Sequence, residues 1–274
     1  MIKANTDKYS INKMCKMLGV ARSSVYYKPC AKSSDSKFEN AVIEEFQKSR
    51  KNYGTRKLKV VLARRGFLAS RRRIGKIMKK YGLVSNYTIK TQPKGKKNLV
   101  NNDPIENKIA REFSNRKQLE VIVSDLTYVK VGGKWNYICL LLDLSNREII
   151  GYAAGKNKDA KLVKSALFAA KADLRKVGYF HTDRGSEFKN RLIEEILTAF
   201  GIKRSLSRPG TPIDNAVAES MYSIIKTEFA FHREWVDLEE LELDLFDYVN
   251  WYNNVRIHGS LGYVTPFEAK NQTA

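Results

Sequence analysis

The sequence of 274 residues is poor in cysteine and histidine, with three of each. Cys15, Cys30 and Cys139 are scattered without a C-x-x-C pair, and all three histidines lie after residue 180. A structural zinc finger needs clustered Cys and His ligands, and a disulfide framework needs paired cysteines. The sequence therefore argues against both, and we expect three reduced thiols that serve packing.

Long apolar runs are also missing. No stretch near 18 residues is continuously apolar, so we expect no membrane-spanning helix. The first ten residues are polar and mixed and do not resemble a secretion signal. We therefore expect a cytoplasmic protein. The hydrophobic content of 43% is enough for a packed core, and the length fits one large domain or two to three small ones.

Positive charge is abundant but unevenly distributed. Residues 1–117 hold 30 Lys or Arg and 8 Asp or Glu, whereas residues 118–274 hold 20 and 21. A charge that served solubility alone would be spread along the chain. The asymmetry indicates an arm that binds a polyanion, joined to a region with another task. Nucleic acid is the favoured partner, although ribosomal and membrane-surface proteins can share this balance.

The first segment, residues 1–35, is predicted to hold two short helices around Gly19. We expect an apolar inner face formed by Ile11, Met14, Leu18, Val20, Val25 and Tyr26. A glycine turn followed by Arg22 and Ser23 at the start of the second helix is typical of a helix-turn-helix DNA reader. We therefore predict that Arg22 and Ser23 contact DNA. A helical hairpin without DNA contact is the alternative.

Residues 36–85 are predicted to form a basic helical DNA-binding domain. Ser70 is the expected N-cap of its third helix, and no acidic residue interrupts the basic surface of that helix. A solvated helix face would normally mix both signs of charge, so we expect phosphate and groove contacts. The predicted DNA-contacting residues here are Arg56, Lys57, Arg71, Arg72, Arg73 and Lys76.

Residues 86–117 are polar and basic and are interpreted as a linker. The remaining residues, 118–274, show three strand-like segments followed by alternating helices and strands. We predict helices over 159–176 and 186–200, strands over 178–182 and 202–206, and helices that begin near 214 and 238. This order predicts an α/β domain with a mixed sheet flanked by helices.

Three acidic residues stand out within this domain. Asp125 lies inside an otherwise apolar strand, Asp183 follows a strand and precedes Gly185, and Glu219 falls in a predicted helix that Asp214 would cap. A lone carboxylate in an apolar strand is costly unless it is paired or bound to metal. Two Mg²⁺ ions, which prefer carboxylate oxygens, assist phosphodiester cleavage. Lys226 follows Glu219 by two helical turns and is placed to hold DNA beside such a site.

The spacing of these acids, with 57 and then 35 intervening residues, resembles the Asp-Asp-35-Glu signature of the DDE transposase and retroviral integrase superfamily. The sequence around these acids is similar to that of the second-frame (OrfB) product of the insertion sequence three family of transposases. The matching motifs are Ser124-Asp-Leu-Thr-Tyr128, Asp143-Leu-Ser-Asn-Arg147, His181-Thr-Asp-Arg-Gly-Ser-Glu-Phe188, Asp214-Asn-Ala-Val-Ala-Glu219 and Tyr252-Asn-Asn-Val-Arg-Ile-His258. The similarity covers essentially the whole chain.

The resemblance implies a ribonuclease-H-like catalytic core in which Asp125, Asp183 and Glu219 are catalytic and bind two Mg²⁺, with Mn²⁺ able to substitute. It implies cleavage at the ends of a bacterial element, which frees a 3′-hydroxyl that then attacks another phosphodiester. Its implied partners are double-stranded DNA at inverted-repeat ends and target, further copies of the same chain on DNA, and an upstream-frame (OrfA) product or fusion. The protein would associate with the nucleoid when bound to DNA.

Several further residues receive roles at this stage. Asn215, Lys226 and Arg256 are expected to contact DNA. Asp143 is expected to be structural, and His181 and His258 to be satisfied core or surface residues. One position departs from the family pattern: Ile122 stands where a tryptophan is common, and we expect a small loss of packing there.

Three other classes compete with this interpretation. A DNA-binding regulator would use the basic helices while the acidic domain only dimerises. A retroviral-type integrase would need a His/His/Cys/Cys zinc unit at its front, where this chain has no histidine. A structure-specific nuclease explains the two predicted DNA-reading units less well.

Overall fold

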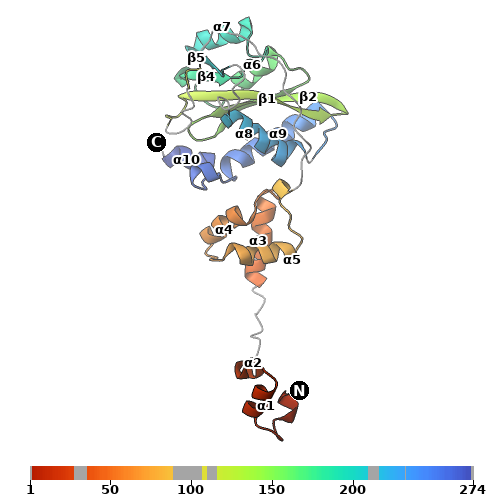
Figure 1. Cartoon of the computed structure of the whole chain (residues 1–274). Helices are drawn as coiled ribbons and strands as arrows, with labels where there is room; N and C mark the ends of the chain where they lie inside the picture. Colours follow the sequence, from red (N-terminus) through yellow and green to blue (C-terminus); the bar gives the residue numbers. More distant parts are fainter. Residues whose placement is uncertain are drawn as a thin grey trace. The chain divides into compact units, whose positions relative to one another are not determined.

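The computed structural model describes residues 2–27, 36–88, 107–109, 116–208, 216–231 and 233–272. Within these ranges the chain forms two compact units, Met1–Asn40 and Ala41–Ala274 (Figure 1). The predicted linker over 86–117 and the predicted cap at Asp214 lie largely or wholly outside the described residues. No described helix has both the length and the apolar character that a membrane crossing requires.

The N-terminal unit holds a 3-10 turn, η1 (Ile2–Asn5), and two short helices, α1 (Ile11–Met17) and α2 (Arg22–Tyr26). The helices join through Gly19, whose φ of 62° lies in the left-handed region that glycine adopts without strain. The predicted inner face is half correct, because Val25 is buried and Ile11 and Met14 are half-buried, whereas Leu18, Val20 and Tyr26 are exposed. Helices of seven and five residues are too short to cover six apolar side chains.

A basic three-helix region follows, with α3 (Ser36–Lys48), α4 (Thr55–Arg64), α5 (Arg71–Lys80) and a short turn, η2 (Asn86–Thr88). Ser70 caps α5 as predicted, since its hydroxyl accepts a hydrogen bond from the Arg73 backbone N–H at 3.2 Å. Apolar residues at helical spacing form the interior of this region: Val42, Phe46, Leu58, Leu62 and Ile74. Their basic neighbours on α5 stay in solvent.

The catalytic-type domain is built on one five-stranded sheet in the order β3-β2-β1-β4-β5. Its strands are β1 (Val121–Val131), β2 (Lys134–Asp143), β3 (Ile149–Gly155), β4 (Tyr179–Thr182) and β5 (Lys203–Leu206). The first three strands pair antiparallel, whereas β1, β4 and β5 pair in parallel. This mixed sheet is the fold class that the sequence predicted.

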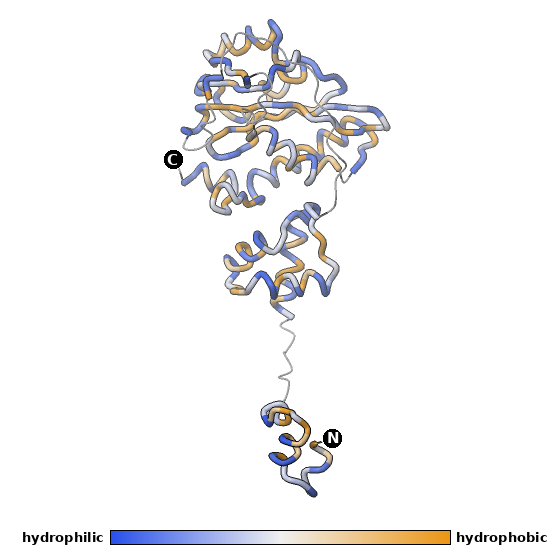
Figure 2. Tube along the Cα trace, viewed as in Figure 1, coloured by the Kyte–Doolittle hydropathy of each residue, from blue (hydrophilic) through white to orange (hydrophobic). Residues whose placement is uncertain are grey.

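Helices cover both faces of the sheet (Figure 1). One face packs on α6 (Ala160–Phe168) and α7 (Arg191–Phe200), and the other packs on α8 (Ala216–Ile225) and α9 (Leu238–Asn254). Alternate residues of β1 serve the two layers: Val123 belongs to the α8–α9 layer and Ile122 to the α6–α7 layer. Figure 2 shows the resulting apolar strands between more polar helices. Ile122 is fully buried, so it fills its core position.

The remaining elements are η3 (Leu174–Lys176), the π-helical turn η5 (Lys226–Ala230), η6 (Gly259–Leu261) and α10 (Pro266–Gln272). Two predicted helices are shorter than expected. The chain leaves α6 so that the Lys171 N–H can donate to the Ile150 carbonyl at 2.7 Å. The helix expected from residue 186 begins only at Arg191, because the Asn190 side chain caps it.

Candidate active site

Asp125 and Asp183 are brought together by the pairing of β1 with β4. Val123 lies opposite His181 in the last pair of this parallel register, and Asp125 and Asp183 each follow two residues further along. Neighbouring strands are about 4.8 Å apart. Position 125 continues the alternation of the α8–α9 face, on which Val123 and Tyr179 pack. Two carboxylates separated by 57 residues in sequence therefore lie beyond the same end of the β1–β4 pair.

Glu219 is carried to this edge by α8, in whose first turn it lies. Tyr222, three residues later on the same side of the helix, donates its hydroxyl hydrogen bond to the backbone carbonyl of Asp125. The same hydroxyl accepts from the Leu140 N–H at 2.9 Å. The helix of the third acid is thus fastened to the strand of the first acid at Asp125 itself. Sequence reasoning did not find Tyr222, since its role depends on where α8 packs.

The donor chemistry of this edge fits a hard divalent cation, because all three candidate ligands are carboxylates. Among the described residues, no three acidic, histidine or cysteine side chains lie close enough together to enclose an ion. Asp125 and Asp183 each lie two residues beyond the last pair of β1 and β4, and Glu219 lies three residues before Tyr222 on α8. Asp183 is further oriented by the Gly185 N–H, which donates to its Oδ1 at 2.9 Å.

A lysine–glutamate pair lies near the two aspartates. Lys158 Nζ is 2.9 Å from Oε1 of Glu187, whose side chain is buried. Glu187, Asp183 and Asp125 together raise the pKa of Lys158 against the opposing effect of its partial burial. The carboxylate folds over Gly185, where an added Cβ would lie 2.5 Å from Oε1. A larger residue here would require the Glu187 carboxylate to move, a consequence that the motif alone did not reveal.

Two other polar residues of the domain are structural, as expected. His181 is fully buried, and its ring nitrogens lie 2.9 Å and 3.3 Å from the hydroxyls of Ser205 and Ser207. Asp143 is also fully buried and accepts hydrogen bonds from the backbone N–H groups of Leu119 and Ser145. Burial raises the pKa of Asp143. Both side chains are satisfied within the fold.

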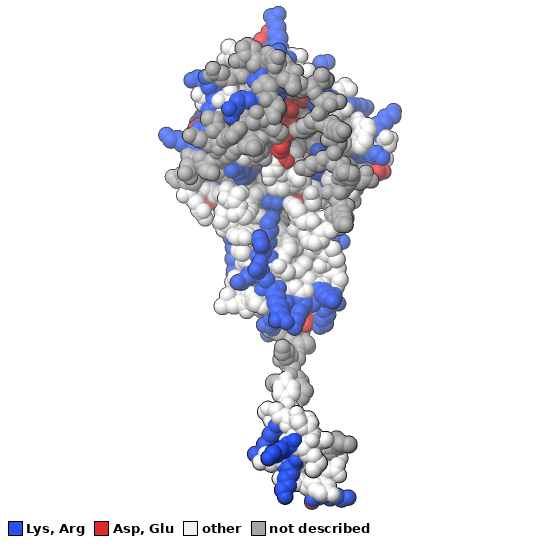
Figure 3. Space-filling model, in the orientation of Figure 1, with Lys and Arg blue, Asp and Glu red and all other residues white. Residues whose placement is uncertain are grey.

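Most residues predicted to contact DNA lie in solvent. The exposed ones are Arg22, Ser23, Arg56, Arg71, Arg72, Arg73 and Lys76. Lys and Arg outnumber Asp and Glu on the visible surface of the three-helix region (Figure 3). Lys57 is only partly exposed, with its Nζ 5.0 Å from the centroid of the Tyr53 ring. Lys226 is also partly exposed, and Asn215 lies outside the described residues.

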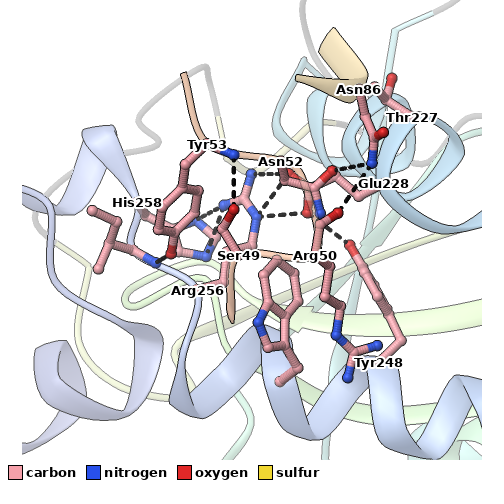
Figure 4. A network of polar contacts seen from close by, with 12 residues as sticks. Ser49, Arg50, Asn52, Tyr53, Asn86, Thr227, Glu228, Tyr248, Arg256 and His258 are labelled. Carbon is pink, nitrogen blue, oxygen red and sulfur yellow. Dashed lines mark hydrogen bonds and ion pairs between the residues drawn. The ribbon is translucent and has the colours of Figure 1, made fainter. Parts of the chain in front are cut away.

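Arg256 occupies a different place from the one expected. It is 3% exposed, and its Nε and Nη2 each lie 2.8 Å from an oxygen of the buried Glu228 (Figure 4). The expectation that Arg256 contacts DNA does not fit this position, because its guanidinium is enclosed and already bound. Glu228 lies in η5, directly after the helix of Glu219, and no sequence pattern marked it as a partner of Arg256.

Tyrosines of the three-helix region contact the catalytic-type domain around the Arg256–Glu228 pair. Tyr87 donates to Glu228, and the Tyr53 hydroxyl accepts from the Ile257 N–H at 2.8 Å. Burial, followed by the nearby charge of Arg256, lowers the pKa of Lys57 to about 8. Burial raises the pKa of Tyr53 to about 12. A largely dehydrated polar network therefore connects the two regions.

Comparison with known protein families gives three matches. Residues 115–212 match the family described as an integrase core domain, and residues 200–266 match a second family of the same description. Residues 33–91 match an HTH-like domain. The fold and the acidic edge thus define the class: a polynucleotidyl transferase of the DDE type, carried with a DNA-binding helical domain.

Full-length relatives identify the family within that class. A 31 kDa protein of insertion element IS600 from Shigella sonnei is 30% identical over 262 residues, covering 92% of this chain and 96% of its own. The transposase InsF for insertion sequence IS3A from Escherichia coli (strain K12) is 27% identical over 285 residues, 98% of each chain. The chain belongs to the insertion sequence three family of transposases.

A solved structure of the HTLV-2 integrase catalytic core domain in complex with magnesium also resembles this chain. The identity is 19%, the TM-score is 0.41, and the match covers 55% of this chain and 95% of that domain.

Proposed function

We propose that this transposase cuts DNA at the ends of its element and joins the freed ends to target DNA, using Asp125, Asp183 and Glu219. The observation that carries the proposal is the hydrogen bond from Tyr222 to the Asp125 carbonyl. It ties the helix of Glu219 to β1, the strand of Asp125, which pairs with β4 just before Asp183. This contact supports the proposal that the three acids serve one site.

The three carboxylates would hold two Mg²⁺ ions, and Mn²⁺ could replace them. Such ions supply Lewis-acid activation of the attacking oxygen and neutralise charge at the leaving oxygen. The chain's own residues keep the carboxylates in place: the Gly185 N–H orients Asp183, and Tyr222 fixes the backbone at Asp125. In the first step water attacks phosphorus and the bond to the 3′-oxygen breaks. In the second step the freed 3′-hydroxyl attacks a target phosphorus, the target's own P–O3′ bond breaks, and the target 3′-hydroxyl leaves.

DNA would be held by basic residues of the catalytic-type domain, the three-helix region and the N-terminal unit. Lys226 follows Glu219 on the same helical face, which favours contact with a phosphate near the cleaved bond. Arg56, Arg71, Arg72, Arg73 and Lys76 are exposed on the three-helix region, and Arg22 and Ser23 on the N-terminal unit. Asn215 remains a proposed DNA contact. The proposed domains are residues 1–35, 36–85 and 118–274, with a linker over 86–117.

We further infer that several copies of the chain assemble on DNA and that an upstream-frame (OrfA) product takes part, alone or fused to this chain. Both inferences rest on membership of the family. Cytoplasmic residence with association to the nucleoid follows from the same DNA-binding role.

The test is a cleavage assay on linear DNA that carries both ends of the protein's own element, with Mg²⁺ and then with Mn²⁺. We expect Asp125→Asn, Asp183→Asn and Glu219→Gln each to lower the cleavage rate about a thousandfold, equal to about 4 kcal/mol of activation free energy. Glu242→Gln is the matched control, because Glu242 is an exposed acid on α9.

Two results would contradict the proposal. Unchanged cleavage by Asp125→Asn would remove the acids from the chemistry. Wild-type protein that binds element ends but cuts none, alone or with the upstream-frame product, would favour the competing role of a DNA-binding regulator.

A further inference from the structure

The hairpin formed by β1 and β2 has two unlike faces beyond the acidic site. Val129 and Val131 point to the core, where they pack with Trp235. Tyr128 and Trp135 point the other way and are 54% and 55% exposed. An outer strand face usually carries polar residues, so two large exposed aromatic side chains require an explanation.

The two rings form one unit. Tyr128 lies opposite Tyr137 and Lys130 opposite Trp135 in the antiparallel register, so these side chains share a face. The centroids of the Tyr128 and Trp135 rings are 5.0 Å apart, and the rings meet edge to face at 87°. This geometry leaves part of each ring open to solvent, and the contact between the rings restricts the motion of both side chains.

A lysine stands over each ring. Lys226 Nζ is 5.1 Å from the Tyr128 centroid, and Lys130 Nζ is 5.8 Å from the Trp135 centroid. Lys130 also lies 3.9 Å from Glu234, but both side chains are well exposed and such a pair is weak. The surface therefore offers aromatic rings and positive charges. A nucleotide carries the matching groups, a base that can stack on a ring and a phosphate that binds a cation.

The elements that carry the proposed catalytic acids also carry this surface. Tyr128 follows Asp125 by three residues on β1, a distance of about 10 Å along the strand. Lys226 follows Glu219 by seven residues, at the end of α8. Tyr222, between them on the helix, is bonded to Asp125. Because Tyr128 and Asp125 are an odd number of residues apart on β1, their side chains point to opposite faces of the strand. Lys226 links the two faces, since it follows Glu219 along the chain and its Nζ reaches the Tyr128 ring.

We propose that Tyr128 and Trp135 form a stacking site for an unpaired base of the bound DNA strand, with Lys226 and Lys130 at its phosphates. A base inside a duplex cannot reach such rings, so the site selects a nucleotide that has left its pair. The inference rests on the proposed function, because it assigns the surface to the strand being cut or joined.

The experiment uses full-length protein and a single-stranded 12-mer that carries one 2-aminopurine, whose fluorescence falls when it stacks on an aromatic ring. Divalent metal is left out, so cleavage does not contribute to the signal. Protein is added to saturation, so the affinity contributed by the basic helices does not determine the signal. We expect strong quenching with wild-type protein and about a tenfold smaller loss of signal with Tyr128→Ala/Trp135→Ala. The double variant Tyr128→Phe/Trp135→Phe should keep most of the quenching.

Phe246→Ala is the matched control, because Phe246 is 53% exposed and has Lys171 Nζ 5.5 Å from its ring centroid. It should quench as the wild type does. Equal quenching by the double alanine variant would overturn the proposal. The proposal would also be overturned if the double alanine variant had a lower solution mass than the wild type without DNA and quenched equally. The surface would then be a contact between copies of the chain.

Because no metal is present, this outcome is independent of cleavage. Quenching that survives in Asp125→Asn, together with lost cleavage, supports both proposals. If the double alanine variant loses quenching and the wild type cuts no DNA, the stacking site is supported and the proposed reaction is contradicted.

Discussion

The guanidinium of Arg256 and the carboxylate of Glu228 form a buried ion pair, with Nε 2.8 Å from Oε2 and Nη2 2.8 Å from Oε1. Tyr248 and Tyr87 donate further hydrogen bonds to the same carboxylate. The pair lies where the three-helix region meets the catalytic-type domain, next to the turn that ends the helix of Glu219. Through Tyr87, which donates to Glu228, the three-helix region is attached to this pair.

Arg256→Ala should strongly destabilise the protein. The change leaves the Glu228 carboxylate buried without its cation, and breaking a buried pair in this way costs about 3–5 kcal/mol of unfolding free energy. Urea denaturation at pH 7 measures the loss. The control is Arg191→Ala, which breaks an exposed pair with Glu195 and should cost less than about 1 kcal/mol. Equal effects of the two changes would show that the buried pair contributes little.

Stability should fall as the solution becomes acidic, in part through His258. Burial, with the charges of Arg256, Lys57 and Arg147, lowers the pKa of His258 from 6.5 to about 2. Between these values the unfolded chain binds a proton that the folded chain refuses, so unfolding becomes easier as pH falls below 6.5. We expect about 2 kcal/mol less stability at pH 5 than at pH 7 from this group.

His258→Gln is the variant that isolates this contribution, since glutamine does not titrate. Urea denaturation of both proteins at pH 7, 6 and 5 should show a steeper decline for the wild type. Parallel curves would mean that His258 accepts a proton in the folded state.

The three arginines at the start of α5 should govern the salt dependence of DNA binding. Each phosphate contact releases counterions and adds about 0.9 to the slope of log affinity against log salt concentration. Replacing Arg71, Arg72 and Arg73 together by glutamine should lower that slope by up to about 3. Fluorescence anisotropy with duplex DNA at several salt concentrations measures it. Arg191→Gln, on α7, should leave the slope unchanged, and an unchanged slope in the triple variant would remove these arginines from the interface.

Tyr222→Phe should impair cleavage more than binding. The change removes the hydroxyl that joins α8 to the Asp125 carbonyl and the Leu140 N–H, so Glu219 loses its fixed position. We expect about a tenfold slower cleavage rate, or about 1.4 kcal/mol, with unchanged affinity for DNA. Tyr248→Phe also deletes a buried tyrosine hydroxyl and should leave the rate unaffected. Similar rates in the two variants would make Tyr222 a residue of general stability only.

Several elements were predictable from local patterns. The cap of α5 by Ser70, the strand of Asp125 and the structural role of Asp143 follow from residue types at short spacing. The ends of α6 and α7 were less predictable, because a tertiary bond to Ile150 and a side-chain cap at Asn190 decided them. Arg256 was misplaced for a related reason. An arginine near polar residues in sequence can serve DNA or an ion pair, and only packing distinguishes the two.

The sequence by itself determined the family and the mixed sheet and led to the proposal of the three acids, because spacing and alternation are written along the chain. Only the tertiary structure decided that Tyr222 fastens the helix of Glu219 to Asp125, that Glu228 encloses Arg256, and that Tyr128 and Trp135 stand together in solvent. Each of these relationships depends on the register of paired strands or on the position at which a helix packs on the sheet. Such contacts depend on how whole elements pack, which local residue patterns do not encode.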